Sequence, residues 1–134
     1  MKAAWLFFAA LGAFGPTSAL AYTGAELRGD CLAAEALYQG EGGDPYAAFR
    51  GARCIAYVAG FADGYAISDY LADKVGVRLN AFCLPRDERL PQRLVRAVLN
   101  QLERLPMDDS STATIVASAL ARSFPCAETL EPRQ

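Results

Sequence analysis

Four cysteines constrain the fold of this 134-residue chain more than any other feature. They are Cys31, Cys54, Cys83 and Cys126, separated by 23, 29 and 43 positions, and no two form a Cys-x-x-Cys pair. This spacing does not predict a zinc site or a thioredoxin-like redox motif. An even number of cysteines favours two structural disulfides, and four cysteines can pair in three ways. Each disulfide would stabilise a small domain by about 2–4 kcal/mol.

The N-terminal residues predict export to an oxidising compartment, where disulfides persist. Lys2 precedes an uncharged, mostly apolar run over residues 3–14, and a Gly-Pro pair ends this run. Ala19 and Ala21 then supply the small side chains of a cleavage site after Ala21. The run is shorter than the about 20 apolar residues that span a membrane. We therefore predict a signal peptide over residues 1–21 and one domain over residues 22–134, with no membrane segment after cleavage.

The absence of histidine from the chain excludes several kinds of chemistry. A Ser-His-Asp triad, a Cys-His pair and a histidine ligand for zinc all need an imidazole. Lys74 is the only lysine after the predicted signal segment, and nothing in the sequence places it beside a serine as an activating base. A net charge of −2 also lacks the basic excess of a nucleic-acid binder. We expect no catalytic residue, metal, cofactor or nucleic-acid partner.

The periodicity of the apolar residues predicts an all-α fold, a small four-to-five-helix bundle with two disulfides. In the longest segment, apolar residues recur at i, i+4, i+7 and i+11 from Cys54 onward. No segment shows the sustained alternation of a strand. The predicted helices run over about Gly24–Leu37, from Tyr46 to about Lys74, onward from near Pro91, and from after Pro106 to the stop at Pro125.

The predicted order of helices favours one pairing of the cysteines. The last two helices are joined by a short turn, so they should run antiparallel, and the end of the last should lie beside the start of the one before. Cys83 and Cys126 flank those two ends, which makes them natural partners. Cys31 and Cys54 then join the first two helices. Sequence alone does not strictly determine the connectivity.

Small residues recur every four positions along the second predicted helix, at Ala56, Gly60 and Gly64. A glycine inside a helix costs about 1 kcal/mol, so two of them need a reason. We expect a neighbouring helix to approach closely at this stripe.

Several local patterns then occur in a fixed order along the chain. Cys31 comes first, followed by Cys54-Ile-Ala-Tyr-Val-Ala-Gly-Phe-Ala-Asp-Gly-Tyr65 and Phe82-Cys-Leu-Pro85. The patterns Gln92-Arg-Leu-Val-Arg-Ala-Val-Leu99, Leu102-Glu-Arg-Leu-Pro106 and Ala119-Leu-Ala-Arg-Ser-Phe-Pro-Cys126 follow. Over about Leu27 to Cys126 the chain resembles the type VI secretion amidase immunity family, the Tai/Rap immunity domain.

The resemblance implies a small, disulfide-bonded, all-helical periplasmic protein that is commonly a homodimer. Members of that family bind and inhibit a peptidoglycan amidase effector delivered by a neighbouring cell, and so protect the cell wall of the producer. Their inhibition involves surface inserted into the active-site cleft of the toxin, so the partner here would be a cognate amidase effector.

The segment from Leu105 to Ser111 is the candidate partner-binding element, through Met107, Asp108, Asp109 and Ser110. One interpretation is a protruding loop that plugs a cleft, because an exposed methionine suits adaptable contacts. The other is a plain turn between helices with acidic capping residues. The sequence favours neither.

Two further sets of polar residues have both a functional and a structural interpretation. Asp63, beside Tyr65, is either a recognition carboxylate or, the more favoured interpretation, the acceptor of a hydrogen bond from a tyrosine or a helix end. Arg89, Arg93 and Arg96 either meet an acidic partner or, more commonly for such charges, form a solvated helix face.

Two other functional classes remain open from the sequence. One is a periplasmic chaperone or stress-protection protein, or more generally a helical module that binds an unknown partner through an apolar groove. The other is a weak enzyme with a carboxylate site such as Asp63 and Asp69. We favour the immunity protein, which acts by binding and needs no catalysis.

Overall fold

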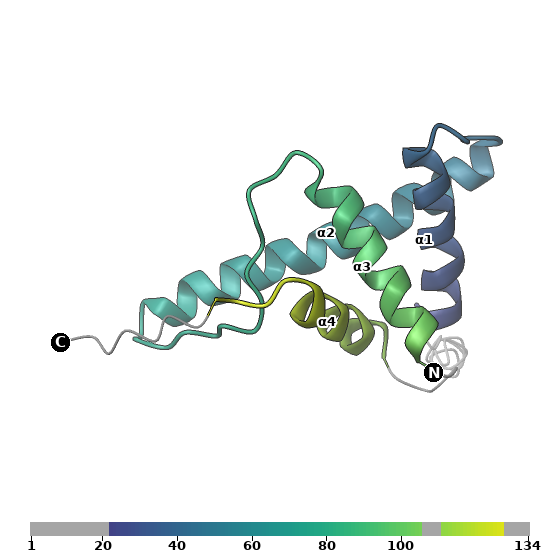
Figure 1. Ribbon diagram of the computed structural model, residues 1–134. Coiled ribbons are helices and arrows are strands. Elements are labelled where there is room, and N and C mark those ends of the chain that lie inside the picture. The colour runs from purple at the N-terminus through teal and green to yellow at the C-terminus, as the bar shows by residue number, and fades with distance from the viewer. Residues whose placement is uncertain (1–21, 106–110, 128–134) are drawn as a thin grey trace, which may run out of the picture.

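The computed structural model describes residues 22–105 and 111–127, and in these ranges the chain forms four helices and no strand (Figure 1). The helices are α1 (Gly24–Tyr38), α2 (Pro45–Asp73), α3 (Leu90–Arg104) and α4 (Thr112–Ser123). The predicted all-α fold is therefore confirmed. No helix in these ranges is both long enough and apolar enough to cross a membrane.

Short polar side chains determine where three of the helices begin. Thr23 and Glu26 cap the start of α1 reciprocally. The Thr23 hydroxyl accepts from the backbone N–H of Glu26 at 3.2 Å, and the Glu26 carboxylate accepts from the backbone N–H of Thr23 at 2.9 Å. Asp44 accepts from the N–H three residues further on at 2.9 Å, and Pro45 follows as the first residue of α2. Ser111 caps α4 in the same way at 3.2 Å.

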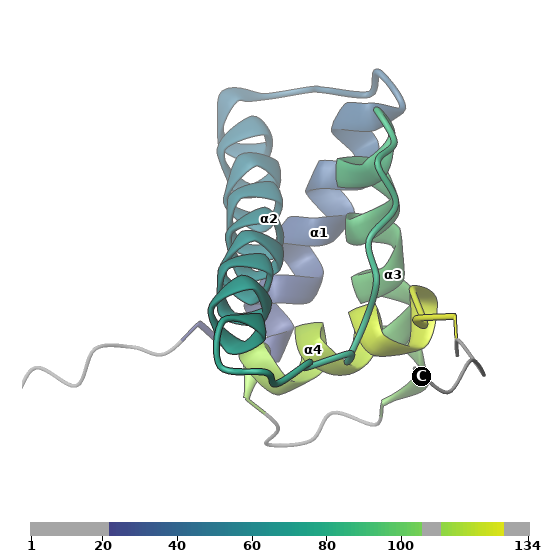
Figure 2. The same cartoon turned by 90° about the vertical axis from the view of Figure 1, so that its left-hand side faces the viewer.

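α1 is the central helix of the bundle. It packs against α2 on one side and α3 on the other, and α4 crosses the end of the bundle near the start of α1 (Figures 1 and 2). The side chains that fill the space between them are fully buried, and each stabilises the fold by about 1.5–3 kcal/mol relative to an exposed position. The largest apolar ones are Leu27, Val58, Val95, Val98, Val116 and Leu120.

Both predicted disulfides are present. Cys31–Cys54 joins α1 to α2, and Cys83–Cys126 joins the segment before α3 to the residues just after α4. The second bridge is supported by a hydrogen bond of 2.8 Å from the backbone N–H of Cys83 to the carbonyl of Phe124. The first bridge thus ties two helices together, and the second ties the residues after α4 to the segment before α3.

The second half of α2 projects beyond the other helices, and the chain then returns along it before α3 (Figure 1). Two polar groups on α2 fix this return. Tyr65 accepts a hydrogen bond from the N–H of Ala81 at 2.8 Å, and its ring stacks on Phe82 with centroids 3.9 Å apart. Asp69 accepts from the N–H of Leu79 at 3.1 Å.

The expected close approach along Ala56, Gly60 and Gly64 is wrong for the single chain. All three residues are exposed, and a Cβ added at Gly60 or Gly64 would meet nothing within 4 Å. The close approach occurs instead at Gly51, where a Cβ would lie 3.1 Å from the backbone of Ala34 in α1. The small-residue stripe lies on the opposite side of α2 from the core.

Candidate partner-binding surface

The predicted partner-binding residues Met107, Asp108, Asp109 and Ser110 lie outside the described residues, but both ends of their segment are fixed. On the α3 side, Leu105 is half-buried against the core and donates its N–H to the carbonyl of Gln101. On the α4 side, Thr112 is buried and its hydroxyl donates to the backbone carbonyl of Tyr22. The segment therefore starts and ends on well-packed positions.

Asp63 and Tyr65 face different surroundings, although they are two residues apart. Tyr65 is half-buried and holds the segment that returns along α2, which is a structural contact. Asp63 is exposed, and no hydrogen bond to its side chain occurs within the described residues. The expected bond from a tyrosine or helix end to Asp63 is therefore absent from this part of the chain.

Asp30, a residue that the sequence analysis did not single out, provides the buried carboxylate. It lies in α1 with none of its surface exposed, and three side chains donate to it. Arg50 Nε lies 3.0 Å from Oδ1, while Arg53 Nε and the Tyr22 hydroxyl lie 2.5 and 2.7 Å from Oδ2. The Arg53 guanidinium also stacks over the Tyr22 ring at 4.9 Å. The sequence did indicate that Asp30 is buried, because it lies three residues after Leu27, on the same side of the helix as the apolar residues of α1.

The electrostatics of this cluster favour an ionised Asp30. Burial opposes the charge, but the hydrogen bonds from Arg53, Tyr22 and Arg50 outweigh it and hold the pKa of Asp30 below its ordinary value. Burial, and then the bond to the same carboxylate, raise the pKa of the Tyr22 hydroxyl. The cluster links α1 to α2 and to residue 22, so its role is to fix the fold.

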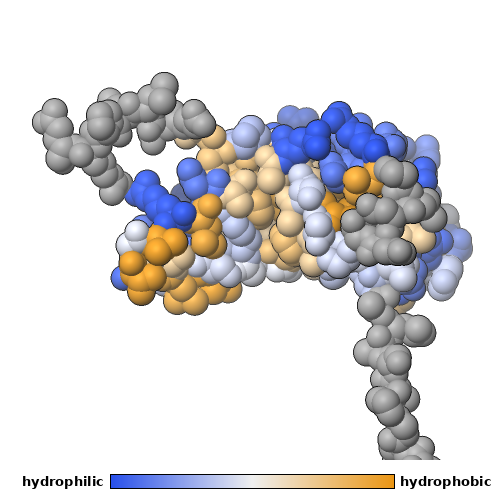
Figure 3. Space-filling model, turned by 90° about the horizontal axis from the view of Figure 1, so that it is seen from below, coloured by the Kyte–Doolittle hydropathy of each residue, from blue (hydrophilic) through white to orange (hydrophobic). Residues whose placement is uncertain are grey.

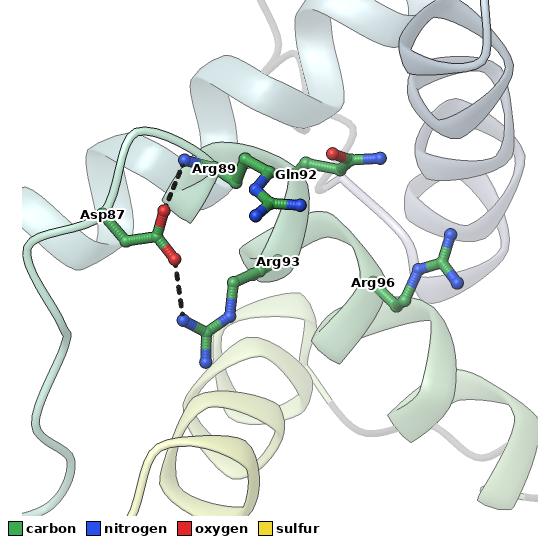
Figure 4. Close-up of a pocket in the computed structure, with 5 residues that line it drawn as sticks. All are labelled: Asp87, Arg89, Gln92, Arg93 and Arg96. Atoms are coloured by element: carbon green, nitrogen blue, oxygen red, sulfur yellow. Dashed lines mark hydrogen bonds and ion pairs between the residues drawn. The ribbon is translucent and has the colours of Figure 1, made fainter.

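An open pocket at the start of α3 is lined mostly by arginines (Figure 4). Its volume is about 350 Å³, and it is lined by Asp87, Arg89, Gln92, Arg93 and Arg96. Asp87 accepts from the N–H of Arg89 at 2.9 Å and from the guanidinium of Arg93 at 3.1 Å. Both hydrogen bonds lower the pKa of Asp87, and the one from the Arg89 N–H has the larger effect.

The arginines of this pocket are oriented differently from one another. Arg93 lies over the ring of Phe124 at 5.3 Å, and Arg96 turns towards α1, where it pairs with Glu35. Arg89 has no ion-pair partner within the described residues. Exposed guanidinium groups bind carboxylates in a bidentate manner, so the pocket suits an acidic side chain of a partner. Each such exposed pair contributes at most about 1 kcal/mol.

Within residues 22–105 and 111–127, no group of three or more cysteine, aspartate or glutamate side chains is placed to hold a metal ion.

Exposed large apolar residues gather on α2 and on the segment after it. Figure 3 shows such residues at the projecting end of the molecule. Those on α2 are Tyr46, Phe49, Ile67, Tyr70 and Leu71, and those on the following segment are Val75, Val77 and Leu79. The residues near the end of α2 and on the segment after it form an exposed apolar patch of the kind that often marks a binding site, whereas Tyr46 and Phe49 lie at the other end of α2.

Comparison with known proteins gives one match. The family model of the Rap1a immunity proteins matches residues 23–126, a range that includes all four helices and both disulfides. No curated protein and no solved structure matches the chain significantly.

Proposed function

Since the chain belongs to the family of Rap1a immunity proteins, we propose that it acts in the periplasm by binding and sterically inhibiting a peptidoglycan amidase delivered by type VI secretion. The observation that supports this most strongly is the family match over nearly all of the described domain. An immunity protein acts on a cognate effector by binding, and occlusion of an active site requires no bond-making step in the inhibitor.

The segment between α3 and α4 is the proposed contact with the effector active site. Its two ends are fixed by Leu105 and by the Thr112 hydroxyl bond to Tyr22. A segment with fixed ends loses less conformational freedom on binding than a free peptide, and this lowers the cost of association. Met107 supplies an adaptable apolar contact, and Asp108 supplies a charge.

The arginine pocket is the proposed second contact. It opens at the other end of α3, away from the segment that follows this helix. An acidic loop of the effector that reached Arg89 would add charge complementarity, which speeds encounter more than it strengthens the final complex. Reversing the charge of Arg89 should therefore lower the association rate, with a smaller effect at high salt.

The test is capture of a secreted amidase encoded beside the gene, using the signal-cleaved protein purified from periplasm. Met107→Arg and Asp108→Arg should each weaken binding by 10-fold or more, on the order of 1.4 kcal/mol. Ala121→Arg, at an exposed position near the end of α4, is the matched control and should bind normally. Undiminished binding by both variants would show that this segment does not contact the effector. Failure of the wild-type protein to bind the amidase would overturn the proposal that an amidase is the target.

The exposed apolar side chains of α2 are the observation that would favour the chaperone alternative. A chaperone should suppress the aggregation of several unrelated denatured proteins. An immunity protein should leave them unaffected while it inhibits one amidase.

A further inference from the structure

We propose that Tyr22 is a positioning residue for effector binding, because it connects the buried Asp30 cluster to the start of α4. The Asp30 cluster consists of Asp30 and the three side chains that donate to it, Tyr22, Arg50 and Arg53. This inference rests on the proposed function, in which the segment between α3 and α4 contacts the effector. It adds that residues outside that segment, in α1, α2 and at residue 22, control how well the segment binds.

The side chain of Tyr22 is held by α1 and α2. Its hydroxyl donates to Asp30 of α1 at 2.7 Å. Its ring meets the ring of Tyr57 of α2 edge-on, with centroids 5.1 Å apart, and the Arg53 guanidinium lies over the same ring at 4.9 Å. Aromatic pairs and cation–π contacts each stabilise an arrangement beyond what burial alone contributes. Tyr22 therefore has a defined orientation relative to these two helices.

The backbone of Tyr22 holds the start of α4. Its carbonyl accepts a hydrogen bond from the hydroxyl of Thr112, the first residue of α4, although the two residues are 90 positions apart. Thr112 is only 6% exposed, and a buried hydroxyl that loses its partner destabilises the fold. The starts of α1 and α4 lie side by side (Figure 2), and a Cβ added at Gly24 would lie 3.1 Å from a methyl of Ile115.

Within residues 22–105 and 111–127, hydrogen bonds and disulfides link α4 and the residues just after it to the other helices and their flanking segments at two places. At the end of α4, the Phe124 carbonyl accepts from the N–H of Cys83 at 2.8 Å, beside the disulfide of Cys83. At the start of α4, the link is the bond from Thr112 to Tyr22. Without it, polar and covalent links would hold α4 only at its far end. The first turn of α4, and the segment that leads into it, would then lose its fixed position.

The contacts of Tyr22 also make the position of signal cleavage important. Tyr22 is the first residue after the expected cleavage at Ala21. Its hydrogen bonds within the described chain use the side-chain hydroxyl and the carbonyl, and none of them uses its backbone nitrogen. A chain that begins at Tyr22 therefore keeps both bonds. A chain that begins one residue later, at Thr23, loses both at once.

The test compares Thr112→Val, which keeps the shape of the side chain but removes the donor, with Thr112→Ser, which keeps the donor. The probe is the amidase that the signal-cleaved wild-type protein captures. Substitutions that act on a site through other residues change affinity by roughly 2- to 30-fold. We expect Thr112→Val, and a chain that begins at Thr23, to raise the dissociation constant by about 5- to 10-fold. Thr112→Ser should bind like the wild type. Tyr65→Phe removes a hydroxyl bond from the projecting half of α2, so it is the matched structural control and should also bind normally.

A double-mutant cycle separates positioning from a general loss of stability. If Tyr22 acts through the segment, Thr112→Val should add little to the weakening caused by Met107→Arg, because the contact that it positions is already lost. Additive effects would overturn the proposal, and so would an unchanged dissociation constant in Thr112→Val with only a lower urea midpoint. Undiminished binding by both Met107→Arg and Asp108→Arg would overturn the proposed contact itself, and this inference with it.

Amide hydrogen exchange tests the positioning without an amidase. The N–H of Ile115 donates to the carbonyl of Ser111 at 3.0 Å and closes the first turn of α4. Loss of the bond to Tyr22 should speed its exchange by about 2- to 10-fold in Thr112→Val. Thr112→Ser and Tyr65→Phe should leave it unchanged. Exchange at Ile115 in Thr112→Val that is no faster than in the wild type would overturn the proposal whether or not an amidase is bound.

Discussion

Replacing Asp30 by asparagine tests whether the buried carboxylate fixes the fold. The substitution keeps the shape of the side chain but removes the charge that faces Arg50, Arg53 and the Tyr22 hydroxyl. Breaking a fully buried ion pair costs about 3–5 kcal/mol. Here the two arginines are 35% and 43% exposed, so water can solvate them when the charge is lost. Hydrogen bonds to a charged group are worth about 1.5–3 kcal/mol, so we expect a loss of about 2–3 kcal/mol at pH 7.

Urea unfolding of the oxidised protein, followed by circular dichroism, measures this loss. A loss of that size corresponds to a melting temperature lower by roughly 10–20 °C for a domain of this size. Asp63→Asn is the matched control, because Asp63 is exposed and should change stability by less than about 0.5 kcal/mol.

The pH dependence provides a second check on Asp30. Its pKa is lower in the folded chain than in the unfolded chain. Its contribution to stability is therefore present above the unfolded value of about 3.9 and is lost as the pH falls through the lower folded value. The difference between wild type and Asp30→Asn should shrink as the pH falls below about 4. Equal stability of Asp30→Asn and Asp63→Asn at pH 7, or a difference that persists unchanged in acid, would refute the reasoning.

Three further predictions concern packing and the segment that returns along α2. Gly51→Ala should lower the free energy of unfolding by about 1–3 kcal/mol, because its Cβ would lie 2.5 Å from a methyl of Leu37. Gly64→Ala should not lower it, because a Cβ there meets nothing within 4 Å, and urea unfolding compares the two variants. Tyr65→Phe should keep the ring stack but speed amide exchange at Ala81, because the acceptor of that N–H is lost; exchange no faster than in the wild type would contradict this. Reduction of both disulfides should lower stability by more than about 4 kcal/mol, measured as the shift in the urea midpoint.

The features of the fold that local chemistry determines can be predicted from the sequence. The second helix is expected from Tyr46 and begins one residue earlier, at Pro45, because the Asp44 cap and the fixed φ of proline act within one turn. The two cysteine pairings followed from helix order, because a short turn makes neighbouring helices antiparallel. These predictions needed only neighbours in sequence or in helix order.

The features that were missed depend on contacts between distant residues. Asp30 accepts hydrogen bonds from arginines that are 20 and 23 positions further along the chain. No feature of the α1 sequence predicts which residues these partners are. The glycines of α2 look alike in sequence, yet only Gly51 faces α1 while Gly60 faces outward. A helix such as α2 has apolar residues on two sides. The packing of all the helices together decides which of these sides faces the core.

The order of the two disulfides has a consequence for how the protein matures. Each bridge joins cysteines that are consecutive along the chain, Cys31 with Cys54 and then Cys83 with Cys126, so the two covalent loops neither overlap nor interlock. A polypeptide that emerges N-terminus first into an oxidising space can close each loop as soon as its second cysteine appears. If the chain is exported, an oxidase that pairs thiols in order of arrival would form the native bridges directly, and we expect their formation to be independent of a disulfide isomerase.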